Sequence, residues 1–186
     1  MKTSILFISL FCGLLLTSCS EKKQDDSKEI AEEQNEEKFD TTNFEADAEF
    51  AMEAADAGMM EVQAGSLALT KGTSAKVKEF AKMMVDEHTK ANEELKTLAT
   101  GKNITLPSSI SDKHKRKYDD LAEKSGTDFD KAYVELMVKD HKDAVDLFKK
   151  AADDCEDQQI KSWAAEKIPT LEHHLSTAEN MEKEIK

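Results

Sequence analysis

The sequence is poor in the residues that build loops and strands. Its 186 residues include only 6 glycines and 2 prolines, which argues against a loop-rich scaffold. Aromatic residues make up 6% of the chain (8 Phe, 2 Tyr and 1 Trp), whereas the strands of a β-sandwich favour aromatic and β-branched side chains. With 35% charged and 39% hydrophobic residues, the composition indicates one helical domain with a modest core.

Positive charge is also scarce. The chain has 26 Lys and Arg residues against 39 Asp and Glu residues, which gives a formal net charge of −13 and a pI near 4.9. The phosphates of nucleic acid and the headgroups of anionic lipids would repel such a protein. The charge balance therefore excludes nucleic acid as a partner.

The N-terminus has the pattern of a bacterial lipoprotein signal. Lys2 supplies a positive charge, and residues 5–16 form an almost entirely apolar run. About a dozen apolar residues are too few to span a bilayer, but they fit the core of a signal peptide. The run ends in Leu-Thr-Ser-Cys, which resembles the lipobox, where the cysteine thiol carries the lipid. We therefore predict a signal peptide over residues 1–18 and lipidation of Cys19.

This lipid would be the protein's contact with the membrane and would anchor it to the bacterial cell envelope. Ser20 stands where many inner-membrane lipoproteins have an aspartate, which favours the outer membrane, facing the periplasm. Because Cys12 would leave with the signal peptide, Cys155 would be the one free thiol of the mature chain, and no intramolecular disulfide could form. We interpret Cys155 as a structural or incidental thiol.

The segment after the lipidation site is strongly charged. Of the 19 residues from 20 to 38, 12 are charged and only Ile30 and Ala31 are apolar. Such a segment buries too little apolar surface to offset its ordering entropy. We therefore expect residues 19–42 to be the lipidated cysteine and a disordered acidic tether, and residues 43–186 to be the folded domain.

Helical periodicity begins near residue 43 and predicts an all-α four-helix bundle. Gly72 ends the first helix, and Thr73 or Ser74 can cap the second. Pro169 must kink or break the fourth helix. The connection between the second and third long helices is long enough for a crossover and contains a short helix. The predicted long helices are 43–71, 74–100, 126–153 and 156–185, and the short one is 112–124.

Heptad spacing places one polar residue near the middle of each inward face. These residues are Glu61, His88, His141 and His174, and each lies among apolar a and d positions. Lys167 is a further misfit on the fourth face. We predict that the four central residues point into the bundle and are candidate metal ligands.

Two other histidines and two glycines complete this pattern. His173 shares a face with polar residues and His114 lies in the short polar helix, so we expect both to face solvent. Gly58 and Gly65 flank Glu61 on one helix face. Each costs about 1 kcal/mol of helix propensity relative to alanine, which indicates that something approaches the helix closely there.

Three stretches of the sequence resemble a family of bacterial domains of unknown function, the one numbered 4142. They are AKMMVDEHTKANEEL, GTDFDKAYVELMVKDHKDAVDLF and IPTLEHHLSTAE, and the resemblance covers residues 44–182. The family pattern has an acidic residue before a histidine, matched by Glu87, a histidine matched by His141, and a proline-to-histidine segment matched by 169–174. The resemblance implies a ferritin-like four-helix fold and an outer-membrane protein, and it implies no activity.

A ferritin-like fold raises the question of a di-iron centre, which needs Glu-x-x-His motifs. The residues three positions before the inward histidines are Val85, Val138 and Leu171, so the sequence argues against this chemistry. One carboxylate and three imidazoles suit zinc, copper, nickel or ferrous iron instead. Seven methionines after the initiator also leave copper handling open, although methionine at helical spacing is more often core filler.

The predicted depths of the four residues argue against a shared metal. Counted from turns near residues 71 and 154, Glu61 and His141 lie about six residues nearer the turn than His88 and His174, which is about 9 Å. Separate polar layers that fix helix register are the alternative to a metal site. The sequence therefore favours a lipid-anchored envelope protein with a structural or interaction role, with a periplasm-facing module for a divalent transition metal or copper as the alternative. The protein partner stays open, and an enzyme is the least supported class because no nucleophile–base pair appears.

Overall fold

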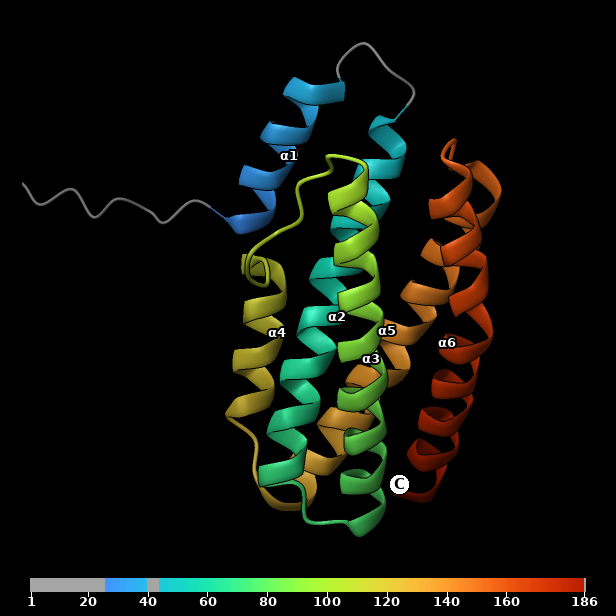
Figure 1. Ribbon diagram of the computed structural model, residues 1–186. Coiled ribbons are helices and arrows are strands. Elements are labelled where there is room, and N and C mark those ends of the chain that lie inside the picture. Colours follow the sequence, from blue (N-terminus) through green and yellow to red (C-terminus); the bar gives the residue numbers. More distant parts are fainter. Residues whose placement is uncertain (1–25, 40–43, 186) are drawn as a thin grey trace, which may run out of the picture.

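In the computed structural model, residues 26–39 and 44–185 are described, and every regular element within these ranges is a helix (Figure 1). None of these helices combines the length and the apolar character that crossing a bilayer requires. The predicted signal peptide and Cys19 lie outside the described residues. The helices are α1 (Ser27–Phe39), α2 (Glu45–Lys71), α3 (Ala75–Gly101), α4 (Asp112–Ala122), α5 (Gly126–Asp154) and α6 (Gln158–Ile185).

The four long helices form two antiparallel hairpins. α2 pairs with α3, α5 pairs with α6, and the hairpins pack together mainly through α2 and α5. The connection over residues 102–125, which includes α4, returns along the bundle, so that α3 and α5 both run upward in Figure 1. This crossover confirms the predicted all-α, ferritin-like four-helix bundle with a short helix between its second and third long helices.

Two apolar clusters fill the bundle above and below a polar layer. In the upper cluster, the rings of Phe50 and Phe148 meet nearly at right angles with their centroids 5.1 Å apart. In the lower cluster, Met60, Met84 and Tyr133 are fully buried. Burial of side chains of this size stabilises the fold by about 1.5–3 kcal/mol each, and the two clusters hold the polar layer between them.

Each hairpin turn is capped by an aspartate from the other hairpin. Asp130 at the start of α5 accepts hydrogen bonds from the backbone N–H groups of Thr73 (2.9 Å) and Ser74 (2.8 Å). Asp47 at the start of α2 does the same for Glu156 (2.9 Å) and Asp157 (2.7 Å). Both aspartates are buried. Ser74 occupies the N-cap position of α3, as predicted, but its side chain makes no capping bond, and Asp130 binds the backbone N–H groups directly before the helix.

The predicted disordered tether is wrong over residues 27–39, because α1 is a helix that packs on the bundle. Ala31 and Asn35 on its inner side are buried. Asn35 donates to the Thr105 carbonyl and accepts from the Thr105 N–H, both at 2.8 Å. The composition of the segment concealed this because only two of its residues face inward, and one of them docks through its amide.

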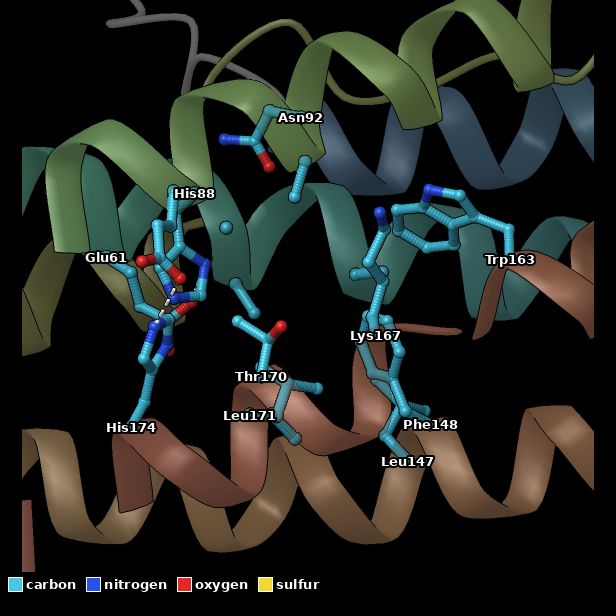
Figure 2. A pocket seen from close by; sticks show the side chains of 16 residues that line it. Glu61, His88, Asn92, Leu147, Phe148, Trp163, Lys167, Thr170, Leu171 and His174 are labelled. Carbon is cyan, nitrogen blue, oxygen red and sulfur yellow. Dashed lines mark hydrogen bonds and ion pairs between the residues drawn. The ribbon is translucent and has the colours of Figure 1, made fainter. Parts of the chain in front are cut away.

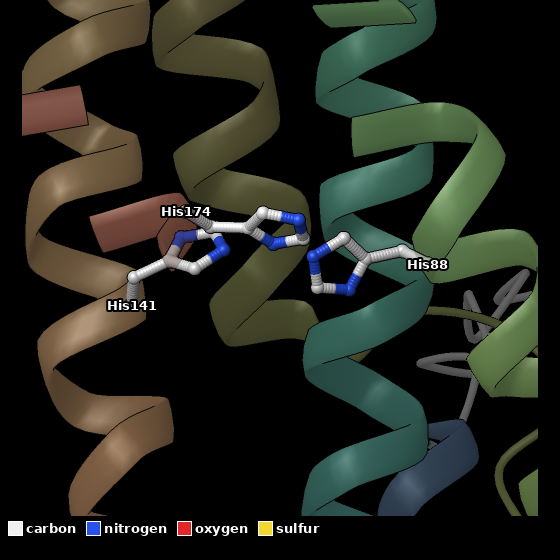
Figure 3. A group of neighbouring side chains, drawn as sticks. All are labelled: His88, His141 and His174. Carbon is white, nitrogen blue, oxygen red and sulfur yellow. The ribbon is translucent and has the colours of Figure 1, made fainter. Parts of the chain in front are cut away.

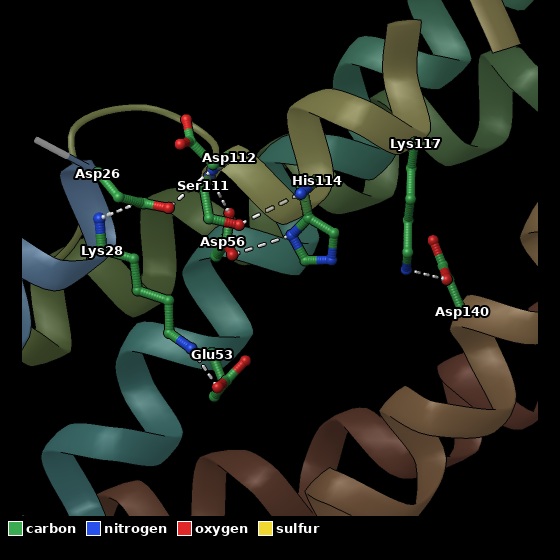
Figure 4. A network of polar contacts seen from close by, with 9 residues as sticks. All are labelled: Asp26, Lys28, Glu53, Asp56, Ser111, Asp112, His114, Lys117 and Asp140. Atoms are coloured by element: carbon green, nitrogen blue, oxygen red, sulfur yellow. Dashed lines mark hydrogen bonds and ion pairs between the residues drawn. The ribbon is translucent and has the colours of Figure 1, made fainter. Parts of the chain in front are cut away.

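His114 is buried, which corrects the expectation that it faces solvent (Figure 4). Its Nδ1 lies 2.9 Å from an oxygen of Asp56 on α2, and Asp56 also accepts from the Ser111 N–H at 2.8 Å. Burial raises the pKa of Asp56, but the bonds from His114 and Ser111 outweigh it and hold the pKa below its ordinary value. An ion pair joins Lys117 to Asp140 of α5 at 2.6 Å. The short helix is polar because polar contacts tie it to two bundle helices.

Helix α6 runs through Pro169 without ending there. Of the predicted kink or break at Pro169, the break is therefore wrong, and the helix remains one element over its whole length. Lys167, the misfit of the sequence pattern, reaches across to α3, where its ammonium lies 2.5 Å from Glu94 and over the ring of Trp163. Its charge is thereby paired at the edge of the bundle.

Candidate metal centre

Three histidines from three helices meet in the polar layer between the two clusters (Figure 3). α3 supplies His88, α5 supplies His141 and α6 supplies His174, and all three are buried. Their ring centroids lie 5.3–5.5 Å apart. One nitrogen of each ring lies within 4.8 Å of one nitrogen of each of the others. Nitrogens bound to one tetrahedral zinc ion are about 3.4 Å apart, so closure on a metal needs movements of about 1 Å.

The expected 9 Å depth mismatch is wrong, for two geometric reasons. The turns span residues 72–74 and 155–157, and measured from their middle residues the mismatch is about three residues, or about 4.5 Å. Helical side chains also lean toward the N-terminus of their own helix. The side chains of Glu61 and His141, on the helices that lead into the turns, therefore lean away from the turns. The side chains of His88 and His174, on the helices that follow the turns, lean toward the turns. The two leanings close the remaining gap.

In two of the rings, one nitrogen is engaged by a carboxylate. His88 Nδ1 lies 2.9 Å from Glu61 Oε2, and His174 Nε2 lies 2.9 Å from Glu87 Oε2. Because an ionised carboxylate only accepts hydrogen bonds, these nitrogens carry protons. Glu87 directly precedes His88 in the chain, yet it orients the histidine of a different helix.

The third ring is oriented by backbone. His141 Nδ1 donates to the carbonyl oxygen of Met137, one turn earlier in α5, at 2.9 Å. The opposite nitrogens of the three rings, Nε2 of His88, Nε2 of His141 and Nδ1 of His174, are buried without a hydrogen-bond partner among the described residues. Histidines that bind metals share this arrangement, in which the second nitrogen donates to a carboxylate or carbonyl and fixes the ring.

Glu61, predicted as a fourth ligand, lies behind the histidine rings. Its carboxylate contacts the protonated Nδ1 of His88, and its other oxygen is 3.5 Å from Nδ1 of His141. Within the described ranges, the cluster whose ligand atoms converge consists of the three histidines alone. The sequence placed Glu61 correctly inside the bundle, but the geometry gives it an orienting position.

The charges of the layer are arranged around Glu61. Burial raises the pKa of Glu61, but the neighbouring His88 and His141 outweigh it and bring the pKa to about 2, so the carboxylate is ionised. Burial lowers the pKa of His88, yet attraction to Glu61 raises it overall. Burial lowers the pKa of His141, and burial together with repulsion from the other two histidines lowers that of His174 to about 4. Two of the three rings are therefore neutral at pH 7, with lone pairs free to bind a metal.

A cleft adjoins the histidine layer on the side that faces the upper cluster (Figure 2). His88 and His174 form its inner end, and Asn92, Lys167 and Thr170 lie along it toward the surface between α3 and α6. Its cavity volume is about 50 Å³. The cleft gives solvent-borne ions a route to the buried rings.

The close approach inferred at two glycines of α2 is that of α3. A Cβ at Gly58 would lie 2.1 Å from Oδ1 of Asn92, and a Cβ at Gly65 would lie 2.9 Å from Cγ2 of Val85. The two glycines thus let α3 pack close to α2. His173, beside His174, is exposed as predicted.

Four long helices, a crossover connection and a buried three-histidine layer define a ferritin-like bundle protein with a candidate metal centre. The sequence matches the model of the family described as Domain of unknown function (DUF4142) over residues 26–181, and the chain belongs to this family. The match confirms the resemblance read from the sequence. It begins at residue 26, so it includes α1, which the predicted domain boundary left out.

Two solved structures share the fold. One is a DUF305 fragment from Deinococcus radiodurans, which is 13% identical, with a TM-score of 0.66 over 75% of this chain and 96% of that chain. The other is a DUF305 protein from Streptomyces coelicolor, described as a predicted secreted protein, which is 14% identical, with a TM-score of 0.65 over 75% of this chain and 93% of that chain. Comparison with curated proteins gives no match. At these identities the likeness concerns the fold alone.

Proposed function

We propose that this protein binds a transition-metal ion through His88, His141 and His174. The observation that carries the proposal is the set of three buried, unpartnered ring nitrogens, one on each of three helices, that face one another. Leaving a buried polar atom unpaired costs about 1–3 kcal/mol. One metal ion would satisfy all three nitrogens at once.

A polar layer that only fixes helix register is the competing explanation. Such a layer is stable when its members are hydrogen-bonded to one another or to backbone. Here the second nitrogen of every ring is bonded in this way, whereas the nitrogens facing the centre are not. In each ring, one nitrogen is fixed by a hydrogen-bond acceptor and the other is left without a partner, and this arrangement favours metal binding over a purely structural layer.

The ligand chemistry limits the choice of metal. Imidazole nitrogens bind zinc, copper, nickel and ferrous iron, and the layer offers no thiolate. Glu61 supports the site from behind by accepting a hydrogen bond from the Nδ1–H group of His88. Zinc is a suitable first probe because it takes three imidazoles without a redox change.

The test is metal binding by purified, untagged full-length protein. Metal content by mass spectrometry and competition with a chromogenic zinc chelator should show one ion per chain. Changing His88, His141 and His174 together to alanine should weaken zinc binding at least 100-fold. His173→Ala is the matched control because it removes an exposed histidine next to His174 and should leave the affinity unchanged.

Folding must be separated from binding in this experiment. Far-UV circular dichroism reports whether the triple variant remains helical, and His174→Gln alone, which retains much of the side-chain volume, should weaken binding at least tenfold. Equal zinc affinity in the parent and in both variants would end the metal proposal.

We further infer that the protein is held at the cell envelope by a lipid on Cys19. The support is the N-terminal charge, the apolar run and the Leu-Thr-Ser-Cys sequence. Cys19→Ala should abolish labelling with palmitate, whereas Cys12→Ser, within the predicted signal peptide, should keep it. Unchanged labelling in Cys19→Ala would refute the lipid anchor.

A further inference from the structure

The cleft beside the histidines exists because small residues occupy its walls. Ala57 and Gly58 of α2, Ala91 of α3 and Ala144 of α5 all line it. Ala91 and Ala144 each follow a histidine by one turn on the same helix. A larger residue at these positions would fill the space directly above the rings.

The opposite side of the layer is closed. Met84 and Met137 lie one turn before His88 and His141, and both are fully buried in the lower cluster with Tyr133. A metal ion held by the three rings would therefore have apolar core on one side and the cleft on the other. Any further ligand would have to arrive through the cleft.

The charge of the layer selects the sign of that ligand. A divalent ion bound by three neutral imidazoles has a charge of +2, and the ionised Glu61 beside it contributes −1. The buried layer as a whole would therefore have a net charge of about +1. An uncompensated buried charge is costly in a medium of low dielectric constant. A monoanion would bring the layer to neutrality. Glu61 is already included in this charge, and Glu87, which accepts a hydrogen bond from His174, is half-exposed, so that water screens its charge.

The cleft also offers a hydrogen-bond donor. The amide of Asn92 has no protein partner within the described ranges, and it projects toward the cleft from α3, one turn after His88 (Figure 2). Its position depends on Gly58, because a side chain there would occupy the place of Oδ1. The amide N–H₂ group can donate to an anion at the inner end of the cleft.

Size completes the description of the ligand. A cavity needs a volume of about 10–15 Å³ to hold one water-sized group. The cleft, with a cavity volume of about 50 Å³, therefore holds roughly three to five atoms. We propose that the metal bound by His88, His141 and His174 keeps one coordination position open toward the cleft and takes a small monoanion of about three non-hydrogen atoms there. This inference rests on the proposed metal binding.

Cobalt(II) and azide test the proposal on purified full-length protein. The visible absorption of bound cobalt reports metal binding, and its change on addition of azide reports an added ligand. We expect a saturable azide-dependent change in the parent protein, and no such change with benzoate, which is too large for the cavity.

Two variants connect this change to the cleft. Ala91→Leu should weaken azide binding at least tenfold by filling the cavity, while cobalt affinity stays within threefold of the parent value. Ala46→Leu, the same change at an exposed position of α2, is the matched control and should bind azide as the parent does. Gly58→Ala, which favours the helix and displaces the Asn92 amide, should weaken azide binding about threefold to tenfold and serves if Ala91→Leu does not fold.

The outcomes separate the two proposals. If the parent binds no cobalt, the metal proposal fails and the open position fails with it. A cobalt spectrum that azide leaves unchanged would overturn the open position while metal binding stands. Parent-like azide affinity in the folded variants would also overturn it, because the anion would then bind elsewhere.

Discussion

Each imidazole of the histidine layer has two nitrogens, and the protein gives them different surroundings. One nitrogen of each ring meets Glu61, Glu87 or the carbonyl of Met137, and the other faces the remaining rings. The outward bonds fix which nitrogen carries the proton. The free nitrogens are thereby held ready as lone-pair donors in the two rings that are neutral at pH 7.

Glu61→Gln tests this division of roles at the scale of one residue. The amide keeps the shape of the side chain but removes the charge that holds the Nδ1 proton of His88. We expect the zinc affinity to fall tenfold to 100-fold, as is usual when the partner of a metal-binding histidine is lost. Competition with a chelator measures the zinc affinity. Glu87→Gln should lower the affinity less than Glu61→Gln does, because Glu87 is half-exposed. An unchanged affinity in Glu61→Gln would show that the carboxylate does not support the site.

The pH dependence of binding follows from His88. Burial lowers the pKa of His88, but attraction to Glu61 raises it overall, so protons compete with a metal for this ring at a higher pH than for a free imidazole. Zinc affinity should therefore fall as the pH is lowered, and metal binding should release protons. Calorimetry in two buffers of different ionisation enthalpy measures this release. Identical heats in the two buffers would contradict the prediction.

At the scale of helices, the reciprocal aspartates set how the hairpins lie against each other. Asp47 and Asp130 each bind the turn of the opposite hairpin, which fixes the longitudinal register of α2 with respect to α5. Because the histidines belong to three helices of both hairpins, a shift in this register would separate them. The caps are thus part of what assembles the site.

Asp130→Ala should destabilise the domain by about 2 kcal/mol, because it leaves the N–H groups of Thr73 and Ser74, directly before α3, without their acceptor. Urea denaturation followed by circular dichroism measures the free energy of unfolding. Asp128→Ala is the matched control, since Asp128 is exposed in the same first turn of α5. Equal losses in the two variants would mean that the cap contributes nothing specific.

At the scale of the whole molecule, a metal ion would link α3 of one hairpin to α5 and α6 of the other. Binding that favours the folded state stabilises it by about 2.7 kcal/mol when the free ligand is at 100 times its Kd. For a domain of this size that raises the Tm by about 5–10 °C. Thermal scans with zinc and with a chelator measure the shift, which should persist in His173→Ala and vanish in the triple histidine variant. A shift of equal size in the triple variant would place the stabilising zinc elsewhere.

The sequence by itself determined the architecture and the inward direction of the polar residues. Apolar a and d positions recur along four long segments, and a helix can bury only one stripe, so Glu61, His88, His141 and His174 had to face the core. The long connection between the second and third of these helices likewise fixed the crossover. These features depend on local periodicity, which one segment shows without its neighbours.

Only the tertiary structure decided which of these residues meet. The rings converge because of turn length and side-chain lean, which shift positions by several Å and leave no pattern in the sequence. The roles of Glu61 and Glu87, the burial of His114 against Asp56 and the docking of α1 all depend on partners far along the chain. From sequence alone, a charged side chain is predicted to face solvent, because burying it without a partner carries a large desolvation penalty. Its burial becomes favourable only through pairing with a residue of another helix, which the sequence does not show.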